Sequence, residues 1–435
     1  MFRQPLRASA VRNPLAALVA VALLAAACGS SSVPSPSAQA SPLATGSSSP
    51  AATASGPSTP APTGVQPTPT ARPSTPPPTA SPSSGASCAQ HVVAGMTLAQ
   101  RVGQLFSLGL ANNQLGPAEL GAIQDQHVGS VWFTATTSIG VAGIKTVTDA
   151  VQAQATTAAT GRVGFLIAAN QEGGQIQALR GPGFSLVPSA VIQGGWSIRR
   201  LTASATLWGQ QLAAAGINLD FAPVADVVPP GTDASNQPIG VLQREYGHDP
   251  ATAGSHAAAF IAGMTAAGVA TTAKHFPGLG RVAQNTDFAA GVVDTVTTAN
   301  DPYLGSFKAT IKAGVPFVMI ALATYTRIDT DHLAAFSSTV IDGILRGSLG
   351  FHGVVVSDSL TATAVSSMTP GDRAIEFLLA GGDLVVARSA GVVVQMVAAV
   401  TARASSDPSF AAVVNRAALL ILEAKRASGL LPCSG

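Results

Sequence analysis

From residue 88 onward, short continuous apolar runs alternate with longer Ala-rich segments along the chain. The longer segments, such as 201–215 and 253–267, carry apolar residues at helical spacing and predict amphipathic helices. The apolar runs are shorter than typical helices and predict strands that are buried on both faces. Eight such runs lie at 103–111, 129–134, 164–169, 217–223, 268–276, 315–322, 353–358 and 382–387.

Eight strand–helix units in succession favour one α/β domain over residues 88–435, folded as a (β/α)8 TIM-type barrel. An open, doubly wound sheet is the alternative, but no Gly-x-Gly-x-x-Gly follows the first predicted strand. In barrels of this type, chemistry takes place at the carboxyl ends of the strands. Polar residues at those ends are therefore the candidates for a functional site.

The first 28 residues predict a secretory signal peptide. Basic residues precede an apolar stretch over 15–27, which is too short to cross a bilayer, since crossing takes roughly 20 residues. The stretch ends in Leu-Ala-Ala-Ala and then Cys28, which resembles a bacterial lipoprotein lipobox. The resemblance implies that Cys28 is lipidated and that the protein is anchored on the outer face of the cytoplasmic membrane. The alternative is an ordinary signal that is cut near Ala27 and leaves a free thiol.

Residues 29–87 predict a disordered tether rich in Ser, Pro, Thr, Ala and Gly. This segment holds 14 of the 30 prolines in the chain and one charged residue, Arg72, so it cannot bury a core. A flexible chain of this length spans about 40–45 Å root-mean-square, and a proline-rich one spans more. We expect the tether to hold the globular domain away from a membrane.

Cys88 and Cys433 are the other two cysteines, and they bracket the predicted domain. In an oxidising compartment such a pair predicts a disulfide between the two ends of the domain, with two free thiols as the alternative. The formal net charge is +2 and only 10% of the residues are charged. No basic stripe indicates a nucleic-acid partner, and no His or Cys motif indicates a metal or a redox cofactor.

Polar side chains gather where the predicted strands end, although the chain is poor in charge. Lys274 and His275 end the run 268–276, and Asp358 ends the run 353–358. Because the carboxyl ends of parallel strands meet at one rim of a barrel, we expect these side chains to surround one site. Further polar positions at strand ends or in the loops that follow them are Asn170, Glu172, Asp220, Asp226 and Arg244.

The segment from Lys274 to Gly280 reads Lys-His-Phe-Pro-Gly-Leu-Gly. It resembles the Lys-His-Phe-Pro-Gly-His-Gly motif of family 3 glycoside hydrolases, especially their β-N-acetylhexosaminidases. The motifs together cover nearly all of 90–425, and they imply a single-barrel bacterial lipoprotein of this family. Further segments that match in family order are 170–174 (similar to Asp-Gln-Glu-Gly-Gly), the loop of Arg244, the turn at 346–353 and the nucleophile motif at 356–360.

The resemblance implies roles for residues at the matching positions. Asp358 is implied to be the nucleophile of a retaining mechanism, in which a carboxylate attacks the anomeric carbon. A helix N-cap is the alternative for Asp358, because Ser-Asp-Ser is also a good capping sequence. Lys274, His275 and Arg244 are implied to bind sugar hydroxyls, and Asn170 occupies the position of a sugar-binding Asp in the family.

Three other acidic residues near the rim are given no catalytic role. Glu172 is structural by the same resemblance. Asp220 and Asp226 either orient Lys274 or Arg244 through salt bridges or accept hydrogen bonds from loop amides.

The family's proton donor is missing from this chain. The family places a His in an Asp-Ser-His motif on the loop after Lys274, and the second His of the first motif is Leu279 here. Counted from Lys274, the family's Asp falls on Asn285 and its His falls on Asp287. A carboxylic acid with a raised pKa serves most glycosidases, so we expect Asp287 to be the general acid. The alternatives are a proton from the substrate or another loop, or a barrel that binds a glycan without efficient cleavage.

The sequence therefore predicts a retaining glycoside hydrolase that removes terminal β-linked N-acetylhexosamine from cell-wall, peptidoglycan-type glycans. The alternatives are a catalytically degenerate barrel lipoprotein that binds such glycans, and a β-glycosidase of other sugar specificity. We expect a monomer with a glycan substrate, no cofactor, no metal and no nucleic-acid partner. Its contact with the membrane is expected through the lipid anchor only.

Overall fold

The eight predicted strands all form, and they belong to one parallel sheet. A computed structural model of the chain describes residues 87–433. The predicted signal peptide over 1–28, with Cys28, and the predicted tether over 29–87, apart from Ser87, lie outside the described residues. The strands of the sheet are β1 (Phe106–Leu110), β2 (Ser130–Phe133), β3 (Leu166–Ala169), β6 (Leu219–Asp220), β7 (Ala270–Phe276), β9 (Phe317–Ile320), β12 (Val354–Ser357) and β13 (Val385–Ala387).

The sheet closes on itself. Its strands follow the order β12-β9-β7-β6-β3-β2-β1-β13, and every neighbouring pair is parallel. The two outer strands, β12 and β13, meet through a parallel bridge between Val356 and Leu384. The Ser357 N–H also donates to the Leu384 carbonyl at 3.0 Å. The (β/α)8 barrel prediction is therefore confirmed, and the open-sheet alternative is wrong.

The strands are shorter than the apolar runs that predicted them. The first run begins inside helix α2 (Leu98–Gln104), which starts at 98 because Thr97 and Gln100 form a capping box. The run at 217–223 forms the two-residue strand β6, and single hydrogen bonds to β7 continue past it, with the Thr272 N–H donating to the Ala222 carbonyl at 2.9 Å and the Lys274 N–H to the Pro223 carbonyl at 3.2 Å. Apolar runs thus locate the strands, but they do not give the exact bounds of the ladders.

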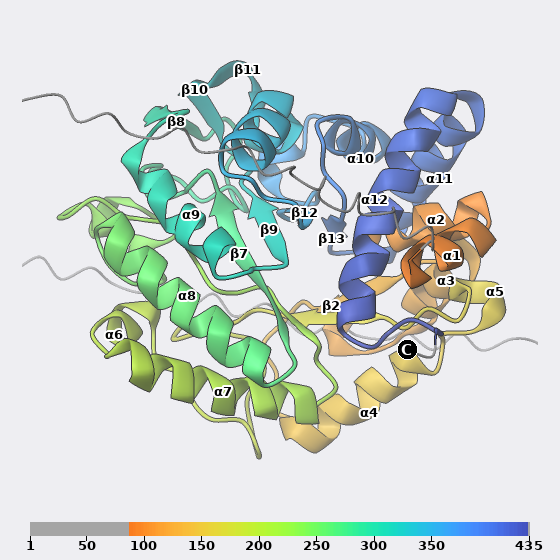
Figure 1. Cartoon of the computed structure of the whole chain (residues 1–435), viewed down its shortest axis with the longest axis horizontal. Helices are drawn as coiled ribbons and strands as arrows, with labels where there is room; N and C mark the ends of the chain where they lie inside the picture. Colours follow the sequence, from red (N-terminus) through yellow and green to blue (C-terminus); the bar gives the residue numbers. More distant parts are fainter. Residues whose placement is uncertain (1–86, 434–435) are drawn as a thin grey trace, which may run out of the picture. The chain divides into compact units, whose positions relative to one another are not determined.

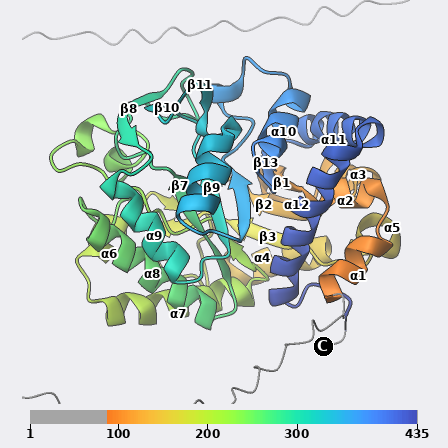
Figure 2. The same cartoon turned by 45° about the horizontal axis from the view of Figure 1, so that its top comes forward.

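Helices surround the barrel, as Figures 1 and 2 show, with β7 and β9 near the centre of the view. The segments predicted at 201–215 and 253–267 form α7 (Ile198–Ala214) and α8 (Pro250–Ala266), which pack against each other. Both begin about three residues early, because Ser197 and Asp249 cap their first turns. The other α-helices are α1 (Cys88–Gly95), α3 (Pro117–Gln126), α4 (Gly140–Gln152), α5 (Thr157–Thr160), α6 (Ala190–Gly194), α9 (Gly305–Lys312), α10 (Pro370–Leu379), α11 (Ala390–Ser406) and α12 (Pro408–Ala427). A π-helix at Thr339–Ser348 lies between β9 and β12.

Two small sheets extend the carboxyl ends of the barrel strands. The hairpin of β4 (Gln171–Gly173) and β5 (Ile176–Gln177) follows β3 directly. A three-stranded sheet of β8 (Val293–Thr298), β10 (Thr324–Arg327) and β11 (Asp329–Leu333) is built from the loops after β7 and β9. These additions build up the rim where the polar residues gather.

The two ends of the described domain meet at the opposite end of the barrel. Cys88 and Cys433 form a disulfide, with their Cα atoms 6.2 Å apart. Helix α1 packs on α12, and the Gly164 N–H, just before β3, donates to the Leu430 carbonyl at 2.8 Å. Lys425 of α12 is fully buried at this end and donates to Gln104 and to the carbonyls before β2 and β3.

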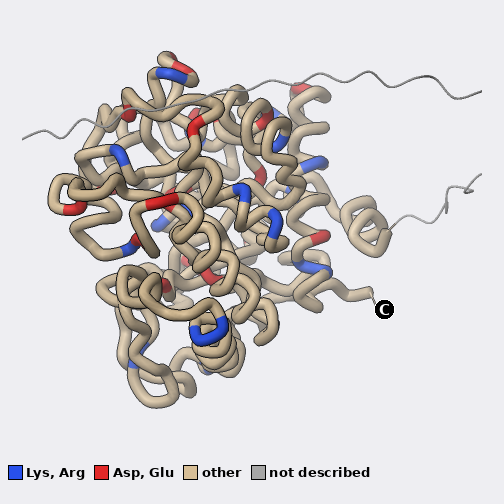
Figure 3. Tube along the Cα trace, turned by 60° about the vertical axis from the view of Figure 1, so that its left-hand side comes forward, with Lys and Arg blue, Asp and Glu red and all other residues tan. Residues whose placement is uncertain are grey.

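Charged residues are scattered thinly over the described chain, and Figure 3 shows positive and negative positions interspersed along the trace. Within residues 87–433, no helix has both the length and the apolar character needed to cross a membrane.

Candidate active site

A pocket of about 270 Å³ opens at the carboxyl ends of the barrel strands. All six residues predicted to bind or transform a substrate line it: Asn170, Arg244, Lys274, His275, Asp287 and Asp358. They come from the ends of β3, β7 and β12 and from two long loops, so closure of the barrel brings them together. The volume of the pocket lies just below the range of about 300–1,000 Å³ that is usual for small-molecule sites. The pocket therefore suits a small ligand, such as one terminal sugar.

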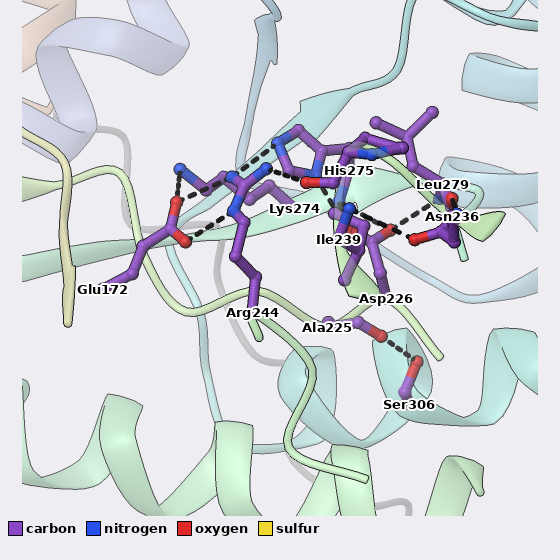
Figure 4. Close-up of polar contacts among 12 residues, drawn as sticks. Glu172, Ala225, Asp226, Asn236, Ile239, Arg244, Lys274, His275, Leu279 and Ser306 are labelled. Carbon is purple, nitrogen blue, oxygen red and sulfur yellow. Dashed lines mark hydrogen bonds and ion pairs between the residues drawn. The ribbon is translucent and has the colours of Figure 1, made fainter. Parts of the chain in front are cut away.

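Lys274 and Arg244 are held side by side by one carboxylate, that of Glu172 (Figure 4). Lys274 Nζ contacts Glu172 Oε1 at 2.6 Å. Arg244 binds the same carboxylate through two hydrogen bonds, both of 2.8 Å. Lys274 Nζ also donates to Asn170 Oδ1 at 2.8 Å. Two cations are thus fixed at the wall of the pocket with little freedom to move.

Glu172 is a buried structural anion, as its sequence context predicts. Burial alone would raise the pKa of its carboxyl, but the charges and hydrogen bonds of Arg244 and Lys274 outweigh that effect and lower the pKa to about 2. A carboxylate this acidic stays ionised throughout the physiological range and has no proton to donate. Glu172 therefore positions Arg244 and Lys274 and is unsuited to proton transfer.

Asp220 and Asp226 form no salt bridge with Lys274 or Arg244, so that interpretation is wrong. Asp220 is fully buried and accepts the Gln171 N–H at 3.0 Å, and its Oδ2 atom has no hydrogen-bond partner among the described residues. Burial raises the pKa of Asp220 to about 7, although the Gln171 N–H and the Lys274 charge act in the opposite direction. Both Asp residues accept backbone N–H groups instead, Asp220 from Gln171 at the start of β4 and Asp226 from Leu279 in the loop after β7. The loop-amide interpretation is therefore correct for Asp226, and Glu172 is the residue that pairs with both cations.

Asp226 orients His275. Its Oδ2 atom lies 2.7 Å from His275 Nδ1, and its Oδ1 atom accepts the Leu279 N–H at 2.7 Å. The His275 Nε2 atom lies 3.4 Å from Arg244 Nη2. Because an ionised Asp only accepts and Arg only donates, these partners assign the proton to Nδ1 and leave Nε2 as an acceptor.

Leu279, at the position of the second His of the family motif, packs into the hydrophobic core and also lines the pocket. Its side chain is buried, and its carbonyl accepts a hydrogen bond from Asn236 Nδ2 at 2.7 Å. A Cβ on the next residue, Gly280, would lie 1.9 Å from the Val227 carbonyl oxygen, so this position has no room for a side chain. The segment after His275 is therefore fixed by close backbone packing and by Asp226.

Asp358 extends into the pocket immediately after β12. Its N–H continues the barrel ladder by donating to the Ile320 carbonyl at 3.1 Å, and its Oδ1 atom accepts the Ser359 N–H at 2.7 Å. The next helical turn, a 3-10 helix at Thr363–Val365, has Ala362 at its N-cap position. Asp358 therefore does not cap a helix, and the N-cap alternative is wrong.

Asp287 reaches the same pocket from the loop after β7. Backbone hydrogen bonds hold this loop against the turn after β12: Thr363 N–H donates to the Asp287 carbonyl at 3.2 Å, and Ala364 N–H to the Thr286 carbonyl at 3.1 Å. Desolvation by the surrounding loops and then the nearby Asp358 charge raise the pKa of the Asp287 carboxyl. Among the residues that line the pocket, Asp287 and Asp358 are the only carboxylic acids.

Other residues also line the pocket, and four of those that were not identified from the sequence are Trp132, Met319, Arg388 and Phe288. Trp132 and Met319 come from β2 and β9, and Arg388 follows β13 directly. The guanidinium of Arg388 lies 5.6 Å from the centre of the Trp132 ring. The rule that polar residues at strand ends mark the site could have identified Arg388. Phe288, the fourth, had no such signal because it lies in a loop.

No cluster of three or more His, Cys, Asp or Glu suited to a metal ion occurs in the part of the chain that the structure describes. A larger hollow of about 630 Å³ lies beside β10, β11 and α10, but none of the rim residues lines it. The chemistry available in the smaller pocket is that of two carboxyl groups beside a row of hydrogen-bond donors.

Sequence comparison relates this chain to known glycosidases. The family described as "Glycosyl hydrolase family 3 N terminal domain" matches residues 97–419. Beta-hexosaminidase of Xylella fastidiosa (strain 9a5c) is 32% identical over 324 residues, which are 72% of this chain and 92% of that protein. Beta-hexosaminidase of Vibrio cholerae (El Tor Inaba N16961) is 35% identical over 236 residues, which are 51% of this chain and 65% of that protein.

Solved structures agree with the sequence matches. The β-N-acetylhexosaminidase of Beutenbergia cavernae is 49% identical, with a TM-score of 0.75 over 76% of this chain and 99% of that one. A family 3 β-N-acetylglucosaminidase of a Paenibacillus species is 29% identical, with a TM-score of 0.70 over 78% of this chain and 64% of that one.

Proposed function

This chain belongs to glycosyl hydrolase family 3, and we propose that it removes terminal β-linked N-acetylhexosamine residues from glycans with retention of configuration. The family match over 97–419 and the β-hexosaminidases among its relatives support the sugar specificity. The observation that carries the mechanism is the presence of just two carboxylic acids, Asp287 and Asp358, among the residues lining the pocket. Retaining glycosidases use such a pair.

In this mechanism Asp358 is the nucleophile and Asp287 is the general acid. The Asp358 carboxylate forms a bond to the anomeric carbon while the glycosidic bond breaks, and the Asp287 proton goes to the leaving oxygen. Asp287 then takes a proton from water, which attacks the anomeric carbon and releases Asp358. Lys274, His275, Arg244 and Asn170 bind the sugar hydroxyls from the wall of the pocket.

Asp358→Ala and Asp287→Asn variants test these roles on two β-N-acetylglucosaminides, one with a nitrophenyl and one with a methyl leaving group. Asp358→Ala should abolish turnover of both. Asp287→Asn should lose about 10²–10⁴-fold on the methyl glycoside and much less on the nitrophenyl glycoside, because a good leaving group needs little proton transfer.

The pH dependence of kcat/KM is a second test of Asp287 as the general acid. An acid must be protonated to act, so wild-type kcat/KM should fall as the pH rises through the Asp287 pKa. Because that pKa is raised, the fall should lie above the usual range of an Asp. The pH profile of Asp287→Asn should lack this fall in kcat/KM. Equal losses on both leaving groups would remove Asp287 from the mechanism, and an inactive wild type would favour the glycan-binding alternative.

We also propose that the natural substrate is a cell-wall glycan and that the enzyme acts outside the cytoplasmic membrane. The signal-like segment over 1–28, the lipobox-like run that ends at Cys28 and the Ser- and Pro-rich segment over 29–87 support this location. A Cys28→Ser variant of the full chain should move from the membrane fraction to the soluble extracellular fraction. Retention of Cys28→Ser in the membrane fraction would contradict lipid anchoring.

A further inference from the structure

Phe288 is the most exposed large apolar side chain in the described part of the chain, at 80% exposure. Single exposed apolar residues are common on protein surfaces and need no explanation by themselves. The position of Phe288 is what sets it apart. It directly follows Asp287, and both residues line the same pocket.

Phe288 and the sugar-binding residues lie at different depths in the pocket. Lys274 and His275 are 2% and 4% exposed and form the buried end, whereas Phe288 stands at the mouth. The turn that carries it is fixed, because the Phe288 N–H donates to the Asn285 carbonyl at 3.0 Å and the Asp287 carbonyl is bonded to Thr363. The backbone that carries the ring is therefore held at the opening of the pocket.

The proposed mechanism indicates which part of the substrate lies beside the Phe288 ring. A general acid must be within hydrogen-bond reach of the oxygen that it protonates, and that oxygen belongs to the leaving group. Consecutive Cα atoms are about 3.8 Å apart, so the residue beside the acid flanks the leaving group. Ile176 and Leu242 add apolar surface to the same pocket. A leaving group that is a ring, with an apolar face of C–H or aromatic carbon, can cover this surface and exclude water from it.

We propose that Phe288 is a specificity-determining residue that supports the ring of the leaving group by stacking against its apolar face. The inference rests on the proposed glycosidase function and adds the subsite beyond the scissile bond. Favourable aromatic contacts are worth about 0.5–1.5 kcal/mol. Loss of the Phe288 ring should therefore lower kcat/KM by about 2- to 10-fold for ring-bearing leaving groups.

The test compares wild type with Phe288→Ala on three β-N-acetylglucosaminyl substrates. These carry a second N-acetylglucosamine, a phenyl group or fluoride, and fluoride offers no ring. Phe288→Ala should lose activity on the first two and keep it on the fluoride. Phe288→Tyr, which keeps a ring, should retain activity on all three. Leu186→Ala is the matched control, because Leu186 is 79% exposed and does not line the pocket.

Each outcome has a distinct meaning. A loss on the disaccharide alone assigns the surface to a pyranose, and a loss on both ring-bearing substrates assigns it to rings in general. Equal activity of Phe288→Ala and wild type on all three substrates overturns the inference. An equal loss of kcat/KM on all three substrates also overturns the inference. So does a shift in the pH at which kcat/KM of Phe288→Ala falls, because either result would mean that the ring acts through Asp287. A wild type that hydrolyses none of the three overturns the proposed function, and this inference with it.

Discussion

The ionisation of the Glu172 carboxyl depends strongly on the residues around it. Glu172 follows a strand in a glycosidase-like motif and could have been taken for a proton donor from the sequence alone. In the folded chain it is buried and bonded to Arg244 and Lys274, which lie 72 and 102 positions later. The two cations make it a permanent anion. Its contribution is to hold the sugar-binding cations in place.

A Glu172→Gln substitution should destabilise the protein by about 3–5 kcal/mol, because it leaves two buried cations without their counter-charge. Chemical denaturation of the variant and wild type measures this difference. Glu376→Gln is the control, since Glu376 is exposed and forms no ion pair in the described structure, and it should change the stability by about 0.5 kcal/mol or less.

The same pair of proteins should differ in their response to acid. The pKa of Glu172 is about 2 in the folded state and about 4.5 in the unfolded state, which corresponds to about 3 kcal/mol of stabilisation. This stabilisation is fully present above pH 4.5 and is lost as the pH falls toward 2. The stability gap between wild type and Glu172→Gln should therefore narrow over that interval. A constant gap would show that Glu172 does not act through its charge.

At the scale of elements, the loop after β7 and the turn after β12 form one unit. The first carries Asp287 and the second follows Asp358, and two backbone hydrogen bonds from Thr363 and Ala364 join them. An acid and a nucleophile must keep a fixed separation for a retaining mechanism. We infer that these two bonds maintain that separation.

Thr363→Pro removes one of the two bonds with little other change to the backbone. Proline has no N–H, it is favoured at the first position of a helical turn, and Ala362 before it is already extended at φ −65°, ψ 157°. We expect kcat/KM on a disaccharide to fall about 2- to 10-fold, as the loss of one hydrogen bond predicts. Thr363→Ala keeps the N–H and should behave as wild type. Equal activities of the two variants would mean that the bond does not position Asp287.

At the level of the whole domain, the disulfide joins the start of α1 to the segment that follows α12. Cys88 and Cys433 are separated by 345 positions, so the bond closes nearly the entire described chain into one loop. Disulfides of long loops restrict the unfolded chain and typically stabilise the folded state by about 2–4 kcal/mol. The bond lies at the end of the barrel opposite the pocket, near the start of β3.

Replacing both cysteines, as Cys88→Ser with Cys433→Ser, should lower the thermal midpoint and leave kcat at 25 °C unchanged. Wild type treated with a reductant should show the same change, which separates loss of the bond from effects of the new side chains. A loss of kcat in the fully folded double variant would contradict a purely stabilising role.

The eight strand–helix units, the barrel and the rim on which the polar residues lie could all be predicted from the amino-acid sequence. These are properties of local pattern, because hydrophobic periodicity and strand-end residues can be recognised within short windows. The motif from Lys274 to Gly280 also indicated the family. The proton donor could only be predicted as a candidate, since Asn285 and Asp287 replace the expected motif.

Which side chains contact one another became clear only from the folded chain. Glu172 pairs with both cations, Asp226 with His275, and Asp287 shares a pocket with Asp358, although each of these contacts joins segments far apart in the chain. Closure of the barrel brings the strand ends together. Burial raises the pKa of Asp220 and Asp287, whereas Arg244 and Lys274 lower the pKa of the equally buried Glu172. Contact and burial depend on the whole fold, so no short window of sequence contains them.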